Sequence, residues 1–92
     1  MIVRIQGEGQ YNVPSSLLDQ LNDLDNRLVV LVSDGDEEGF RKGLSEMLGL
    51  VRSQGSQLPV EEIHPSDVIL PAPDIDLQEA RSLFAEEGLI PG

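Results

Sequence analysis

Two stripes of apolar residues, each repeating every three or four positions, dominate the pattern between residues 16 and 53. The short segment Asp34-Gly35-Asp36 separates them. Spacings of three and four place side chains on one face of an α-helix, and so short a break makes two such helices fold back on each other. The pattern therefore predicts an antiparallel helical hairpin over residues 16–53. The stripes are Leu17, Leu21, Leu24, Leu28 and Leu31 in the first helix, and Phe40, Leu44, Met47 and Val51 in the second.

Polar residues mark the ends of both predicted helices. Ser16, with a carboxylate three residues later, has the spacing of a capping box and predicts the start of the first helix there. Gly35 suits the left-handed position after a helix end, and Asp36 suits the N-cap of the second helix. Glu37 and Glu38 then fall in the first turn, where carboxylates interact favourably with the helix dipole. The reversal between the helices is therefore predicted to be tight.

Three glycines interrupt the predicted second helix, at Gly39, Gly43 and Gly49. Each costs up to about 1 kcal/mol relative to alanine in a helix interior. None of them lies on the apolar stripe. We therefore expect a close backbone contact on the opposite face of this helix, with the sheet or with a partner.

The first thirteen residues alternate between apolar and polar positions, as a half-buried strand does. Gly7-Glu8-Gly9 interrupts the alternation and can adopt positive φ, which predicts a β-hairpin over residues 1–13. A third, short strand is predicted at 67–70. Pro65 and Pro71 bracket it, and because proline cannot donate to a sheet, an edge position is expected.

The C-terminal part predicts a short helix over residues 76–87. Asp76, three residues before Glu79, has the spacing of an N-terminal cap, and Gly88 with Leu89 or Ile90 would close the other end. These elements predict one α+β domain over residues 1–92, made of a β-hairpin, a helical hairpin, a short third strand and a C-terminal helix.

Charge and composition narrow the possible partners. Seventeen acidic and six basic residues give a formal net charge of −11, so nucleic-acid phosphates and anionic lipids should repel the chain. No apolar run approaches the roughly 20 residues that cross a bilayer. Without cysteine there is no disulfide framework, which fits a cytoplasmic protein. We expect no nucleic-acid binding and no direct membrane insertion. The acidity itself either keeps the surface soluble or guides a basic partner.

The segment Asp34-Gly35-Asp36-Glu37-Glu38-Gly39 imitates the first half of a calcium-binding loop. A true loop needs a bidentate glutamate at its twelfth position, which is Ser45 here, and Arg41 and Lys42 place positive charge where ligands belong. His64 is the only histidine and has no cysteine, second histidine or serine-nucleophile pattern to work with. Neither feature predicts a metal or catalytic site.

Two further acidic segments are equally weak as sites. Gly7-Glu8-Gly9 lacks the lysine and the following helix of a phosphate-binding loop. Asp74 and Asp76 with Glu79 could hold a divalent cation loosely, but a helix cap explains them. We therefore predict no catalytic, cofactor-binding or metal-binding residues, and hence a protein that is not an enzyme.

The end of the first predicted helix is apolar nearly all round, because Val29 and Val30 lie outside the leucine stripe. Packing against the N-terminal β-hairpin would explain this, since small domains bury helices on their own sheet. The alternative is an exposed patch reserved for another chain.

The order and spacing of four segments resemble those of the phage-shock-protein-A-associated family, PspAA. The similarity extends over essentially the full length, although no single segment is specific. The segments are Met1-Ile2-Val3-Arg4-Ile5 with Gly7-Glu8-Gly9-Gln10-Tyr11, the helical hairpin, Pro65-Ser66-Asp67-Val68-Ile69-Leu70-Pro71, and Glu86-Glu87-Gly88-Leu89-Ile90-Pro91-Gly92.

The resemblance implies a small cytoplasmic protein that accompanies a phage-shock-protein-A (PspA) homologue, a coiled-coil protein that remodels stressed membranes. It would be a non-enzymatic adaptor in the envelope stress response, membrane-peripheral through its partner. The helical hairpin is the expected docking surface, and the hypothetical partner-binding residues are Val29, Val30, Asp36, Glu37 and Glu38. The alternative is a self-associating module, in which the hairpins of a homodimer form a four-helix bundle.

Overall fold

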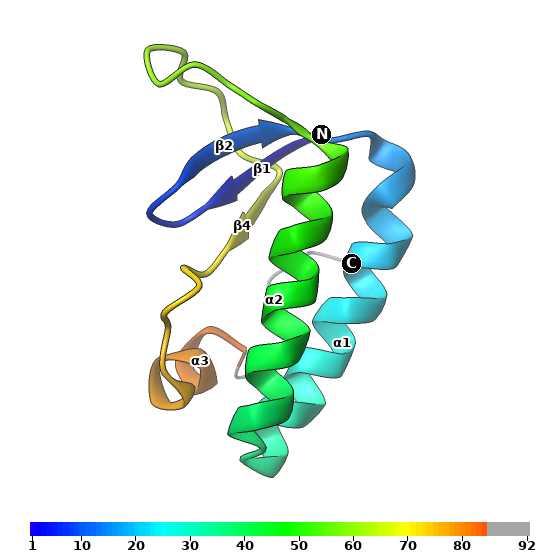
Figure 1. The fold of residues 1–92 in the computed structure, drawn as a ribbon, viewed down its shortest axis with the longest axis vertical. Helices are drawn as coiled ribbons and strands as arrows, with labels where there is room; N and C mark the ends of the chain where they lie inside the picture. The colour runs from blue at the N-terminus through cyan, green and yellow to red at the C-terminus, as the bar shows by residue number, and fades with distance from the viewer. Residues whose placement is uncertain (85–92) are drawn as a thin grey trace.

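The computed structural model describes residues 1–84. Two long helices, α1 (Leu18–Asp34) and α2 (Glu37–Gln54), run antiparallel and side by side along the length of the molecule (Figure 1). A small sheet lies against one end of this pair, and the short helix α3 (Leu77–Leu83) lies against the other. The predicted α+β fold with a helical hairpin is confirmed.

The four strands described within residues 1–84 form one mixed sheet in the order β3-β2-β1-β4. They are β1 (Ile2–Ile5), β2 (Gly9–Asn12), β3 (Ser56–Gln57) and β4 (Val68–Leu70). The strands β1 and β2 form the predicted antiparallel hairpin, while β4 pairs in parallel with β1 at the edge of the sheet, as its flanking prolines predicted. The two-residue strand β3, beside β2, was not predicted.

The core lies between the inner face of the sheet and the two helices. Alternate residues of β1, β2 and β4 point inward with Val13, and both apolar stripes point to the same space. Phe40 of α2 meets Phe84, just after α3, edge to face with ring centroids 6.1 Å apart. Burying each such side chain contributes about 1.5–3 kcal/mol, so the shared core holds the two layers together. The inward strand residues are Val3, Ile5, Tyr11, Val68 and Leu70.

Of the four helix ends predicted within residues 1–84, three are confirmed. Gly35 has the left-handed conformation (φ 74°), and Asp36 and Asp76 accept hydrogen bonds from the amides three residues on, at 2.9 and 2.7 Å. The predicted Ser16 cap is wrong. A 3₁₀ turn, Ser15–Leu17, precedes α1, and Leu17 takes the N-cap position of α1 without a side-chain hydrogen bond.

The expected contact of the helical glycines with the sheet or a partner is wrong for two of them. An alanine Cβ at Gly43 would lie 2.8 Å from Leu28 Cδ2, and one at Gly39 would lie 2.9 Å from Leu31 Cδ2. Both glycines therefore face α1. They let the backbones of α1 and α2 approach, because the apolar stripe of α2 is occupied by the shared core. An alanine at Gly49 would meet nothing within 4 Å.

The C-terminal helix begins where the sequence predicts. Asp76 is the N-cap and α3 extends over Leu77–Leu83, against the predicted 76–87. Residues 85–87 of that prediction, and the expected cap at Gly88 with Leu89 or Ile90, lie outside the described residues.

Candidate functional site

The two valines expected to contact a partner lie on different sides of α1. Val30 is 57 % exposed, whereas Val29 is half-buried against the core. Val29 borders a hollow of about 300 Å³ with Val32 and Phe84, next to α3. The valine-rich end of α1 therefore lies beside the α3 region, and Val30 is the more exposed of the two valines.

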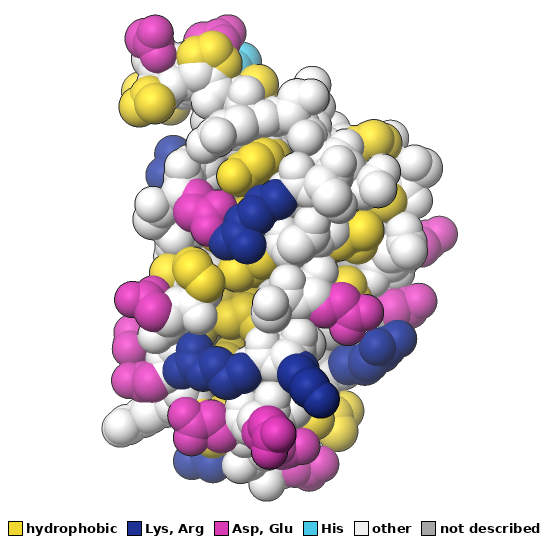
Figure 2. Space-filling view, viewed as in Figure 1, with side chains coloured by type: hydrophobic (Ala, Val, Ile, Leu, Met, Phe, Trp, Pro, Cys, Tyr) yellow, Lys and Arg dark blue, Asp and Glu magenta, His cyan; other side chains and the backbone are white. Residues whose placement is uncertain are grey.

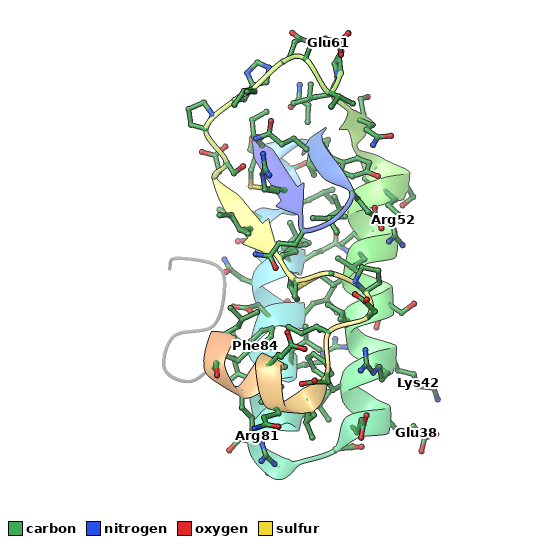
Figure 3. All side chains as sticks on the ribbon, turned by 90° about the vertical axis from the view of Figure 1, so that its left-hand side faces the viewer. Glu38, Lys42, Arg52, Glu61, Arg81 and Phe84 are labelled. Carbon is green, nitrogen blue, oxygen red and sulfur yellow. The ribbon has the colours of Figure 1, made fainter. Side chains whose placement is uncertain are left out.

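The acidic residues at the start of α2 are exposed, but they share the end of the hairpin with cations. Asp36 Oδ1 accepts a hydrogen bond from the amide of Gly39, and Asp36, Glu37 and Glu38 are all exposed. Figure 3 shows Glu38 and Lys42 on α2 and Arg81 on α3 at the same end of the molecule. The hairpin end is thus a surface of mixed charge.

A groove of about 370 Å³ runs between the outer sides of α1 and α2. Leu24 and Leu50 supply its apolar part, and the other lining residues are Gln20, Asp23, Arg27 and Glu46. Asp23, Arg27 and Val30 recur at spacings of four and three, so Val30 continues the same face of α1. This groove and Val30 form the outer face of the helical hairpin.

Most of the segments that were weighed as metal, phosphate or catalytic sites and rejected have a structural role. Asp76 caps α3, and among residues 1–84 no group of three acidic or histidine side chains is placed to hold a metal ion. Gly7 and Gly9 have positive φ values of 87° and 123°, as a turn requires. His64 Nε2 lies 3.9 Å from Glu62 Oε1, within the loop that precedes β4.

Glu8 links the tip of the β-hairpin to α2. Arg52 donates two hydrogen bonds to its carboxylate, one of them from Nε at 3.0 Å, and the Tyr11 hydroxyl donates a third at 3.2 Å. The hydrogen bond from Arg52 lowers the pKa of Glu8, while burial and then the Glu8 charge raise the pKa of Tyr11. This network fastens the sheet to the end of α2.

The loop of residues 58–66 is a candidate site that the sequence reasoning missed. It projects beyond the sheet at one end of the molecule (Figure 1). Val60 and Ile63 are 94 % and 85 % exposed, and they line a hollow of about 190 Å³ between the loop and the sheet. The signal for it was present: two apolar residues enclose Glu61 and Glu62 between two prolines. Such a segment does not bury its apolar side chains in a helix or strand.

Of three comparisons with known proteins, one finds a match. No curated protein and no solved structure matches the chain. Among the described residues, no helix is both long and apolar enough to cross a membrane. The model of the family described as PspA-Associated protein, PspAA, matches residues 1–92. Because this match covers the whole chain, the protein belongs to the PspA-associated protein family.

Proposed function

We propose that this protein is a non-enzymatic, cytoplasmic partner of a PspA-type membrane-remodelling protein in the envelope stress response. The family match over residues 1–92 carries the proposal, because the family takes its name from association with PspA. The protein would reach the membrane only through that partner. The charge balance of −11 supports this, since an acidic protein does not compete for the anionic lipid that such a partner binds.

The outer face of the helical hairpin is one of two candidate docking surfaces, and the loop of residues 58–66 is the other. The groove on the hairpin suits a helical partner. A helix of the partner lying in the groove between α1 and α2 would cover Leu24 and Leu50 and approach Val30. Glu37 and Glu38 would stand at the rim of this contact, where charges influence the rate of association more than the final affinity. Asp36 is exposed beside them and caps α2 through Oδ1 alone, so it would stand at the same rim.

A non-enzymatic role is supported by what the conspicuous carboxylates do. Asp36 and Asp76 hold the first turns of two helices, and Glu8 holds Arg52. A general acid or base needs a side chain that can reach a substrate and exchange a proton. These three carboxylates are instead engaged in fixing the fold.

Titration of the purified chain with the PspA homologue of the same organism tests the proposal. We expect saturable binding that weakens between about 0.05 and 0.5 M salt, because charge contributes to the encounter. An unrelated acidic protein of similar size and charge is the control and should not bind. Absence of binding by calorimetry and by co-sedimentation would refute the proposal. The alternative is self-association, and sedimentation of the chain alone measures it. A chain that stays monomeric at all concentrations would exclude this alternative.

A further inference from the structure

The two most exposed large apolar side chains within residues 1–84 lie three positions apart on the projecting loop. Val60 and Ile63 are 94 % and 85 % exposed, whereas the next, Val30, is 57 % exposed. Single exposed apolar residues are ordinary, but neighbouring ones on a projection make a patch that can enter a pocket on another protein. Figure 2 shows this lobe standing clear of the body of the molecule, with hydrophobic side chains beside acidic ones.

The loop is held in place by a buried glutamine of the sheet. Gln10 is 5 % exposed, and its Nε2 donates to His64 O at 2.5 Å and to Ser66 Oγ at 2.9 Å. Its Oε1 accepts from His64 N at 3.2 Å, and Gln10 O accepts from Leu58 N at 2.9 Å. Both ends of the loop are thus tied to the same residue of β2. A contact segment that is already ordered loses less conformational entropy on binding.

The charge of this segment is of one sign. Glu61 and Glu62 are exposed between the two apolar residues, and the sequence has no lysine or arginine from residue 53 to residue 80. Figure 3 places Glu61 at the tip of the loop, at the opposite end of the molecule from Lys42 and Arg81. The complementary surface is therefore an apolar position bordered by lysine or arginine.

The same features count against two other occupants. In a two-fold contact with a second copy, Glu61 and Glu62 of each chain would face those of the other, and like charges repel. On an anionic bilayer, the two glutamates and the net charge of −11 would oppose insertion of two short apolar side chains.

We infer that the loop tip, Val60–Ile63, is the contact through which this protein binds its PspA-type partner, on a surface whose apolar position is flanked by lysine or arginine. The inference rests on the proposed function and locates its binding surface at the loop in place of the outer face of the hairpin. Val60 and Ile63 enter the apolar position, and Glu61 and Glu62 pair with the basic residues around it.

Two pairs of variants test the inference. In each pair, one variant changes the loop and the other, its control, changes the end of the hairpin. V60S/I63S removes the apolar contact, and V30S removes an exposed valine elsewhere. E61Q/E62Q and E37Q/E38Q each neutralise two adjacent exposed glutamates, so both change the net charge equally. Because all these side chains are exposed, we expect melting temperatures close to that of the wild type.

Binding to the PspA homologue is measured by calorimetry. We expect V60S/I63S to weaken binding about tenfold or more, as loss of a central apolar contact does. E61Q/E62Q should weaken it a few-fold and reduce its salt dependence. V30S and E37Q/E38Q change the alternative docking surface on the hairpin, and both should bind as the wild type does if the loop is the contact.

Three results would overturn the inference. The first is wild-type affinity in V60S/I63S, and the second is a loss of affinity in V30S or E37Q/E38Q instead. The third is binding of the chain alone to vesicles of phosphatidylethanolamine and phosphatidylglycerol that depends on Val60 and Ile63. Failure of the wild type itself to bind the PspA homologue is a different result, because it refutes the proposed function.

Discussion

Replacing Gln10 by leucine should release the loop of residues 58–66 while leaving the rest of the sheet intact. Leucine fills a similar space but makes none of the three side-chain hydrogen bonds to His64 and Ser66. Each such bond contributes about 1 kcal/mol net, and water can reach part of both partners, so we expect a loss of about 2 kcal/mol. For a domain of this size, that corresponds to a fall in Tm of roughly 8–16 °C.

Urea unfolding and amide hydrogen exchange measure the two parts of this prediction. The free energy of unfolding should fall, and the His64 amide should lose protection because its acceptor, Gln10 Oε1, is gone. The Val13 amide, bonded to Met1 O at 2.8 Å, should stay protected and is the internal control.

Gln10→Glu is the matched control variant. Its carboxylate can accept from the His64 amide but cannot donate to His64 O, so at neutral pH it should destabilise the protein at least as much as leucine does. Unfolding of Gln10→Leu within about 0.5 kcal/mol of the wild type, with unchanged exchange at His64, would refute the reasoning.

Two further predictions concern α2. Gly49→Ala should stabilise the protein by about 0.5–1 kcal/mol through helix propensity alone. Gly43→Ala should destabilise it by about 1–2 kcal/mol, because its Cβ would press on the buried Leu28. Equal shifts of Tm in the two variants would contradict the close contact between α1 and α2. Arg52→Met should cost about 0.2–1 kcal/mol at neutral pH, since the pair with Glu8 is partly exposed. Arg52 lowers the pKa of Glu8 in the folded state, so this contribution is complete above the pKa of Glu8 in the unfolded chain. The contribution disappears as the pH falls through the lowered pKa of Glu8. If the wild type and Arg52→Met differ in urea stability by the same amount at every pH, the pairing is contradicted.

Local rules were enough for the helices and for three of their ends. The apolar spacing located α1 and α2, and Gly35, Asp36 and Asp76 acted as the caps that their residue types favour. Each of these features depends on residues within about one helical turn of one another. Ser16 shows the limit of such rules, because a 3₁₀ turn there leaves Leu17 at the N-cap of α1.

The candidate contact surface depended on contacts between distant segments. Gln10 and His64 are 54 positions apart, and nothing in the residues around either one predicts their hydrogen bonds. For the same reason, sequence spacing grouped Val29 with Val30, although only Val29 lines the hollow beside α3.

The sequence by itself determined the α+β composition, the helical hairpin, the edge position of β4 and membership of the PspAA family. The tertiary structure alone decided that Gly39 and Gly43 face α1, that β3 pairs with β2, and that Gln10 fixes a loop with exposed Val60 and Ile63. The physical reason is the distance along the chain over which each interaction acts. Periodicity, caps and prolines act along a few residues, whereas packing and hydrogen bonding choose among partners that only the folded chain brings together.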